Sequence, residues 1–263
     1  MGRAARNWCA RDGLSSGLAA PGRRALVIIY GRNAVHEALR ARRRRVHEIW
    51  VTSGAAKESW LDQSGTPKPL VVSGDEVERL AASTSHQGIC ARVDPYPYAD
   101  AAALLAVPDA LIVALDEVQD PQNLGAIIRT AEGVGATGVV IPERRSAEVT
   151  PAACKASAGA AEWLPVAQVR NIADFLGDAK EAGCWCYGAA ADPAAVHYMQ
   201  PDWRGGVVLV MGAEGKGLRP RVAACCDALV ALPLRGKLDS LNVNAAAAAL
   251  LYGILQKRVD SAS

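Results

Sequence analysis

The sequence predicts an α/β protein with a small α/β domain followed by a larger domain built on a parallel sheet. Short, strongly apolar segments alternate with helical ones from residue 111 onward, which is typical of a parallel sheet covered on both faces. Two prolines within residues 94–98 interrupt regular structure ahead of that region. With 263 residues, the chain is long enough for each domain to bury a core.

The small domain is expected over residues 25–95. Asn33 is expected to cap a short helix through Arg40, and Ser73 has capping-box spacing to Glu76 for a second helix. Apolar and β-branched segments give the expected strands, which are residues 46–51, 70–72 and 89–93. An alanine-rich linker is expected over residues 96–107.

The larger domain is expected over residues 108–263. Its expected strands are residues 111–115, 138–141, 184–188, 207–211 and 229–232. Its expected helices are residues 123–134, 171–182 and 242–255. Parallel sheets present ligands just beyond the carboxyl ends of their strands, so we expect a site after these strands.

Residues 1–24 are rich in Arg, Gly, Ala and Ser, and Asp12 is their only acid. They lack the apolar core of a secretory signal, so we expect a disordered extension on a cytoplasmic protein. An organellar transit peptide has a similar composition and stays open as an alternative. No apolar run approaches the roughly 20 residues that a membrane-spanning helix needs, so no membrane role is expected.

The charge is unevenly distributed along the chain. Residues 1–106 hold 15 Lys and Arg against 10 Asp and Glu, whereas the remainder holds 14 against 17. The basic front half therefore indicates a polyanionic partner. The seven cysteines have no C-x-x-C spacing and His is scarce, so we expect reduced, apolar cysteines and no metal site.

Three segments carry the candidate chemistry. The first reads N-x-G-x-x-x-R-T-A from Asn123 to Ala131. The second, M-G-A-E-G-K-G from Met211, is glycine-rich, but it is not a Walker A loop because Gly217 follows Lys216. The third reads L-P-L-R-G from Leu232 and continues to S-L-N-V at residues 240–243. Each segment taken alone also fits a capped helix or a structural loop.

In this order and spacing the three segments resemble the motifs of the SpoU (TrmH) branch of the SPOUT RNA methyltransferases. Residues 30–39 and 86–89 resemble the family's N-terminal substrate-binding domain, which is similar to ribosomal protein L30e. The resemblance implies a C-terminal segment threaded into a deep trefoil knot, an arrangement that general topology rules would reject. It also implies a homodimer that uses S-adenosyl-L-methionine as methyl donor and needs no metal.

The resemblance assigns roles to individual residues. The implied catalytic residues are Asn123, Arg129, Glu214, Ser240 and Asn242. The implied donor-binding residues are Met211, Gly212, Leu232, Leu234, Leu241 and Asn242. Asn244 stands where many relatives carry Ser. Arg129 has two open roles, as a general base or as a cation that stabilises the developing alkoxide, and the second is physically easier for a guanidinium.

A run of six arginines lies within 14 residues of the first domain, and we expect it to contact RNA phosphates. These residues are Arg32, Arg40, Arg42, Arg43, Arg44 and Arg45. The resemblance implies 2′-O-methylation of a ribose, of a guanosine in large-subunit ribosomal RNA. Methylation of transfer RNA and a non-catalytic RNA-binding role remain as alternatives.

Overall fold

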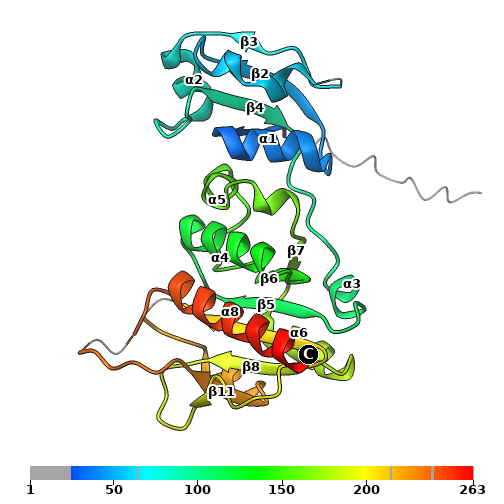
Figure 1. The fold of residues 1–263 in the computed structure, drawn as a ribbon, viewed down its shortest axis with the longest axis vertical. Coiled ribbons are helices and arrows are strands. Elements are labelled where there is room, and N and C mark those ends of the chain that lie inside the picture. The colour runs from blue at the N-terminus through cyan, green and yellow to red at the C-terminus, as the bar shows by residue number, and fades with distance from the viewer. Residues whose placement is uncertain (1–24, 64, 214, 238–239, 263) are drawn as a thin grey trace, which may run out of the picture.

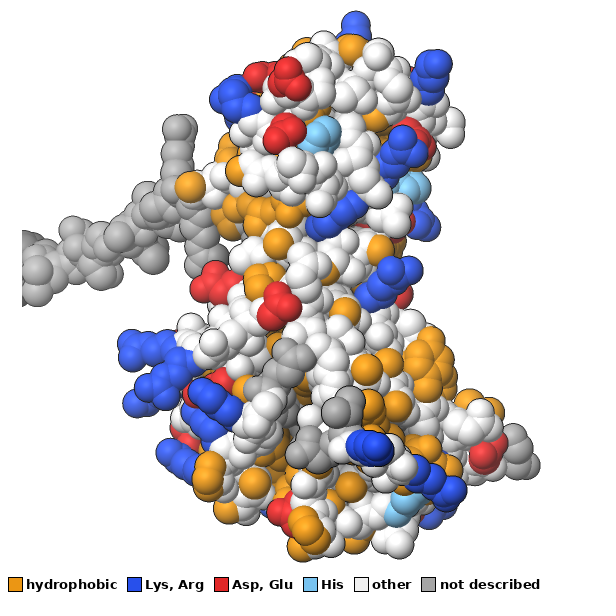
Figure 2. All heavy atoms as spheres, turned by 90° about the vertical axis from the view of Figure 1, so that its left-hand side faces the viewer, with side chains coloured by type: hydrophobic (Ala, Val, Ile, Leu, Met, Phe, Trp, Pro, Cys, Tyr) orange, Lys and Arg blue, Asp and Glu red, His pale blue; other side chains and the backbone are white. Residues whose placement is uncertain are grey.

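A computed structural model describes residues 25–63, 65–213, 215–237 and 240–262. These residues form two lobes joined at a narrower waist (Figures 1 and 2). Each lobe contains its own sheet, so the α/β fold class is confirmed. The expected disorder of residues 1–24 lies outside the described residues.

The first lobe contains a mixed four-stranded sheet of order β1-β4-β2-β3. Its strands are β1 (Val27–Tyr30), β2 (Val46–Val51), β3 (Leu70–Val71) and β4 (Ile89–Val93). Its helices are α1 (Arg32–Ala41), α2 (Gly74–Ala81) and the 3-10 turns Ala55–Lys57 and Ser59–Asp62. β3 pairs parallel with β2, whereas the other pairings are antiparallel.

The second lobe contains a seven-stranded sheet of order β7-β6-β5-β10-β8-β11-β9 in which every named pairing is parallel. Its strands are β5 (Leu111–Asp116), β6 (Gly138–Pro142), β7 (Val166–Val169), β8 (Trp185–Ala189), β9 (Val196–His197), β10 (Val207–Gly212) and β11 (Ala228–Ala231). Because the central strand β10 is buried throughout, its apolar side chains serve both faces.

Helices cover both faces of this sheet. Leu124 of α4 (Pro121–Gly133) and Leu250 of α8 (Val243–Ala262) share a core with Val113 on one face. Leu176 of α6 (Ile172–Glu181) shares a second core with Ile112 on the other face. The remaining helices are α3 (Ala101–Leu105), α5 (Pro151–Ala156), α7 (Pro220–Ala224) and the 3-10 turn η3 (Ala160–Glu162). The two-sided parallel sheet that the sequence predicts is therefore confirmed.

The caps of two helices differ from the sequence prediction. Gly31, not Asn33, precedes α1, and it makes no side-chain cap. α4 begins at Pro121, two residues before the expected start at residue 123, and Asp120 caps it because its Oδ1 accepts a 2.9 Å hydrogen bond from the amide of Gln122. Pro121 then begins that helix, a position where a missing N–H costs nothing. Ser73 caps α2 as predicted, at 3.2 Å from the amide of Glu76.

The segment between the lobes packs on the second sheet. Ala99 forms a bridge with Ala167 at the edge of the sheet, and α3 lies within the expected linker. The sequence analysis missed this helix, along with β1, β7, β9, α5 and α7. Domain boundaries after residues 95 and 107 stay a proposal. No helix among the described residues is long and apolar enough to cross a membrane.

Candidate active site

A cavity of about 500 Å³ opens beyond the carboxyl ends of β8, β10 and β11. That edge of a parallel sheet is the usual place for a ligand. Five of the six residues expected to bind the methyl donor line the cavity, namely Met211, Gly212, Leu232, Leu234 and Leu241. The sixth, Asn242, lies outside the lining, although the neighbouring Ser240 and Val243 belong to it.

The first wall of the cavity is the loop that leaves β10. The loop folds back at once, because the amide of Ala213 donates to Gly217 O at 3.1 Å and the amide of Gly217 donates to Ala213 O at 2.9 Å. A Cβ at Gly212 would lie 2.2 Å from the carbonyl carbon of Gly217. Only glycine permits this backbone approach. Glu214, the expected catalytic residue of the loop, lies outside the described residues.

The second wall is the segment between β11 and α8. Leu234 and Leu241 are 40% and 47% exposed, although both are apolar and border the cavity. Val243, Ala246 and Leu250 of α8 complete this wall. A cavity of this size, with aliphatic side chains on its walls and polar groups at its edge, is typical of sites for small molecules.

An ion pair ties the glycine loop to the end of β5. Asp116 is fully buried and accepts from the Arg219 backbone amide at 2.9 Å and from its Nε at 2.7 Å. The bond with Asp116, against the cost of burial, raises the pKa of Arg219. The sequence analysis missed this pair, and its one signal was a carboxylate that ends the apolar run of β5.

The first and third motifs meet between two helices. Asn123 is buried in the first turn of α4, and its Oδ1 accepts from Asn244 Nδ2 at 2.9 Å. Asn242 Oδ1 accepts from the backbone amide of Asn244 at 2.9 Å, just ahead of α8. The structure thus brings Asn123 close to Asn244 and Asn242. Asn244, which stands where many relatives carry Ser, makes the direct contact between the motifs.

Arg129 is exposed on α4 and lies outside the lining of the cavity. Within the described part of the chain its side chain forms no hydrogen bond or ion pair, so its guanidinium is available to a ligand. The expected catalytic residues are therefore divided: Ser240 borders the cavity, Asn123 and Asn242 join through Asn244, and Arg129 stands apart from both groups.

The expected RNA-contacting arginines also divide. Arg32, Arg40, Arg42 and Arg45 are exposed, with Arg32 paired to Glu58 and Arg40 paired to Glu37. Arg43 is half-buried and donates to the carbonyl oxygens of Leu164 and Pro97. Arg44 is a correction to the expected set: its side chain is 2% exposed and pairs with Glu162, so it has no surface to offer RNA in this conformation.

The cysteines and acids form no metal centre in the part of the chain that the structure describes. No group of three or more His, Cys, Asp or Glu in residues 25–63, 65–213, 215–237 and 240–262 has the arrangement of a metal site. The six cysteines of these ranges are free, and four of them are buried.

Comparison with protein families gives two matches that together span most of the chain. The SpoU rRNA Methylase family matches residues 110–252. The RNA 2′-O ribose methyltransferase substrate binding family matches residues 28–99. The two matches correspond to the larger and smaller lobes.

Similar curated proteins are bacterial tRNA or rRNA methyltransferases. The putative TrmH family tRNA/rRNA methyltransferase YacO of Bacillus subtilis is 37% identical, with 88% of this chain and 95% of that protein covered. The 23S rRNA (guanosine-2′-O-)-methyltransferase RlmB of Pseudomonas syringae gives the same identity and coverage. The uncharacterised tRNA/rRNA methyltransferase slr0955 of Synechocystis is 39% identical, and the chain spans only 63% of its length.

Solved structures share this fold. The AdoMet-bound rRNA methyltransferase of Sinorhizobium meliloti superposes with a TM-score of 0.74 at 25% identity, over 88% of this chain and 87% of that one. The SpoU methyltransferase AviRb of Streptomyces viridochromogenes, in complex with AdoMet, gives 0.76 at 23% identity, over 89% and 91%. At 23% identity this similarity supports the fold alone.

Proposed function

Because the chain belongs to the SpoU rRNA methylase family and is an S-adenosylmethionine-dependent methyltransferase, we propose that it methylates the 2′-hydroxyl of a ribose in large-subunit ribosomal RNA. The ribose is proposed to be that of a guanosine. The single observation that carries the proposal is the combination of the donor-sized cavity with a first lobe that matches the substrate-binding family.

The cavity suits the methyl donor. Its leucine walls offer apolar surface to an adenine ring, while the folded-back loop after Gly212 offers backbone donors and acceptors to the polar parts. We propose Met211, Gly212, Leu232, Leu234 and Leu241 as the residues that hold it. When bound, the donor supplies a methyl group that is already electrophilic because it is attached to a sulfonium.

The protein's own task is then to prepare the ribose hydroxyl. Holding the oxygen in line with the donor removes much of the entropic cost of the encounter. We propose that Arg129 remains cationic and stabilises the alkoxide that develops as the hydroxyl loses its proton. Ser240, Asn123 and Asn242, and Glu214 outside the described residues, are proposed to orient polar atoms around that oxygen.

Recognition of RNA is proposed to use the exposed arginines of the first lobe. Arg32, Arg40, Arg42 and Arg45 project from α1 and the turn that follows it. Guanidinium groups bind phosphate oxygens in pairs of parallel hydrogen bonds, so this surface suits an RNA backbone. Arg43 is a weaker candidate for RNA contact because its guanidinium already donates to two carbonyl oxygens.

We further propose a homodimer in the cytoplasm. Large apolar side chains of the second lobe are exposed in the single chain, and Figure 2 shows hydrophobic side chains gathered over that lobe. Leu241 beside the cavity and Tyr252 and Val259 on α8 belong to this group. Covering them against a second copy would remove apolar surface from water. The implied trefoil knot of the C-terminal segment is also kept as a proposal.

The decisive experiment gives the purified protein radiolabelled S-adenosylmethionine and, separately, large-subunit ribosomal RNA and bulk transfer RNA lacking the modification. We expect label in the ribosomal RNA, at one 2′-O-methylated guanosine located by primer extension at low nucleotide concentration. Label in transfer RNA alone would replace the substrate with the alternative. Donor binding by calorimetry without transfer to either RNA would favour the non-catalytic role.

A further inference from the structure

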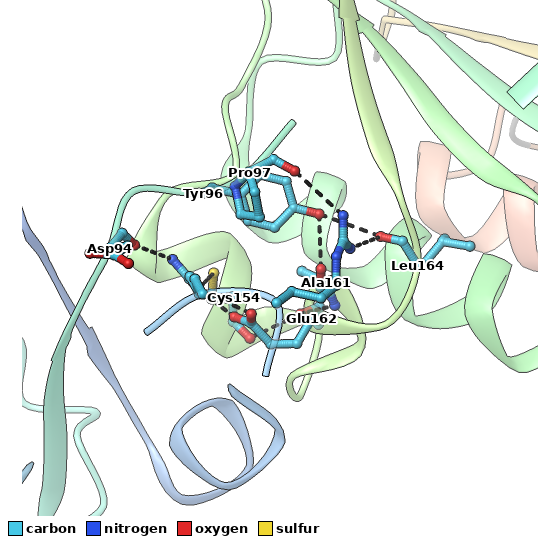
Figure 3. A network of polar contacts seen from close by, with 10 residues as sticks. Asp94, Tyr96, Pro97, Cys154, Ala161, Glu162 and Leu164 are labelled. Carbon is cyan, nitrogen blue, oxygen red and sulfur yellow. Dashed lines mark hydrogen bonds and ion pairs between the residues drawn. The ribbon is translucent and has the colours of Figure 1, made fainter. Parts of the chain in front are cut away.

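The four arginines at residues 42–45, which follow α1, contribute side chains to two different surfaces. Arg42 and Arg45 point to solvent, whereas Arg43 and Arg44 turn toward the second lobe. Figure 3 shows the resulting network at the waist of the molecule, where the carbonyl oxygen of Asp94 is bonded to Arg44 and the hydroxyl of Tyr96 to the second lobe.

Arg44 and Glu162 form a fork-to-fork ion pair between the lobes. Arg44 Nε donates to Glu162 Oε2 at 3.1 Å, and Nη2 donates to Oε1. Their side chains are 2% and 1% exposed. The remaining donors of Arg44 reach the carbonyl oxygen of Asp94 and the Sγ of Cys154, both at 3.4 Å. Both charges are therefore paired in an environment nearly closed to water.

Two further hydrogen bonds join the same regions of the two lobes. Tyr96 Oη donates to the carbonyl oxygen of Ala161 at 2.8 Å, and Trp163 Nε1 donates to Glu37 of α1 at 2.8 Å. A Cβ at Gly159 would lie 2.6 Å from the Cβ of Glu37. The backbone after α5 therefore approaches α1 more closely than a residue with a Cβ would permit.

We propose that Arg44 and Glu162 are positioning residues that hold the RNA-binding lobe in one orientation relative to the donor cavity. A bidentate pair is directional, and a different packing of the two lobes that kept these side chains buried would leave a charge without its partner. This ion pair thus fixes the distance between the donor cavity and the exposed arginines of the first lobe, which are Arg32, Arg40, Arg42 and Arg45. The enzyme then selects a ribose that lies at this fixed span from the bound phosphates.

This inference rests on the proposed function, since it assigns the first lobe to RNA. Its own test is a distance within the protein. Spin labels are attached to p-acetylphenylalanine introduced at Ser85 and Glu181, which are exposed positions in the two lobes. This chemistry avoids the native cysteines. Double electron–electron resonance on the full-length protein is expected to give a single narrow distance, with and without RNA.

The variant Glu162→Gln keeps the size of the side chain but removes its charge. We expect a broadened distance distribution, an S-adenosylmethionine affinity within twofold of that of the parent, and at least a tenfold lower kcat on RNA with little change in KM. Arg44→Lys keeps the charge without the fork and should fall between the two proteins. Glu78→Gln makes the same change at an exposed site of the first lobe, so it should leave the distance unchanged.

The measured distances and the methylation assay distinguish failure of the fixed lobe orientation from failure of the proposed function. A broad or two-peaked distance in the unmodified protein overturns the inference, even if the variants fail to fold. A narrow distance that persists in folded Glu162→Gln overturns it as well. If the unmodified protein does not methylate RNA but the distance broadens in Glu162→Gln, the proposed function is overturned. The inference that Arg44 and Glu162 fix the orientation of the lobes is then still supported.

Discussion

Asn244, at the start of α8, donates a hydrogen bond from its Nδ2 to the Oδ1 of buried Asn123 in α4, with a length of 2.9 Å. The two residues are 121 positions apart in the chain. Their contact joins the first and third sequence motifs at the point where both helices begin.

Replacing Asn244 by Ala removes the donor that faces Asn123. A buried polar atom that loses such a partner costs about 1–3 kcal/mol, so the free energy of unfolding measured in urea should fall by that amount. Gln256→Ala, at an exposed position of the same helix, should change it by no more than about 0.5 kcal/mol. Equal losses in the two variants would contradict a special role for the Asn123 contact.

Gly212→Ala should weaken donor binding. The new Cβ would meet the carbonyl oxygen of Gly217 at 2.4 Å, so the loop that forms the cavity wall must move. We expect S-adenosylmethionine affinity, measured by calorimetry, to fall at least about tenfold, as expected for a lost preformed site. Gly177→Ala, at an exposed position of α6 away from the cavity, is the matched control because its added Cβ meets no atom within 4 Å outside its own helix. Unchanged affinity in Gly212→Ala would remove the loop from the donor site.

Arg129→Ala should slow methyl transfer without weakening the donor. Loss of a group that stabilises developing charge typically costs about 100- to 1,000-fold in kcat, measured here under single turnover. Donor affinity should stay constant, since Arg129 does not line the cavity. Arg129→Lys tests geometry, because an ammonium keeps the charge but not the bidentate fork. Full turnover by the Lys variant would show that the fork is unnecessary.

Arg42→Ala and Arg45→Ala should weaken RNA binding in a salt-dependent way. Each phosphate contact that is lost should reduce the slope of log affinity against log salt by about 1. Filter binding over a range of salt concentrations measures this slope. The distance between the lobes should not change, because both side chains are exposed. If the slope is the same in both variants as in the parent protein, RNA binds elsewhere.

The protein should lose stability in alkaline solution. Burial, the largest cause, raises the pKa of the Cys154 thiol from its ordinary value of 9.0 to about 11. The folded state therefore retains a proton that the unfolded chain releases, so stability is full below pH 9.0 and falls as pH rises to about 11. Urea unfolding between pH 8 and 11, done anaerobically with a reductant, should give a shallower fall for Cys154→Ala. The same pH dependence in both proteins would contradict the shift.

The sequence predicted the fold class and most of the central strands, because apolar segments record burial on both sheet faces. It placed the helix caps less well. Asp120 and Asn123 are both good capping residues, and the choice between them depended on where Pro121 begins the helix. Short edge elements such as β9 were missed, since two exposed residues carry no periodic pattern.

Part of the candidate site could also be predicted from the sequence. The resemblance of the three motifs implied five donor-binding residues that all line one cavity, because Met211 and Gly212 end β10 and the three leucines follow β11. The Asp116–Arg219 pair and the Asn123–Asn244 bond could not be predicted in the same way. Each joins residues more than 100 positions apart, and no local spacing encodes such a contact.

The arginines at residues 42–45 show which properties follow from the local sequence and which depend on the tertiary structure. By itself the sequence determined that residues 42–45 are strongly basic and follow a short helix. Only the tertiary structure decided that Arg44 pairs with Glu162 inside the waist while Arg45 stays in water. The physical reason is that a charge can be buried only beside a partner of opposite sign. That partner lies 118 residues away, on the other lobe.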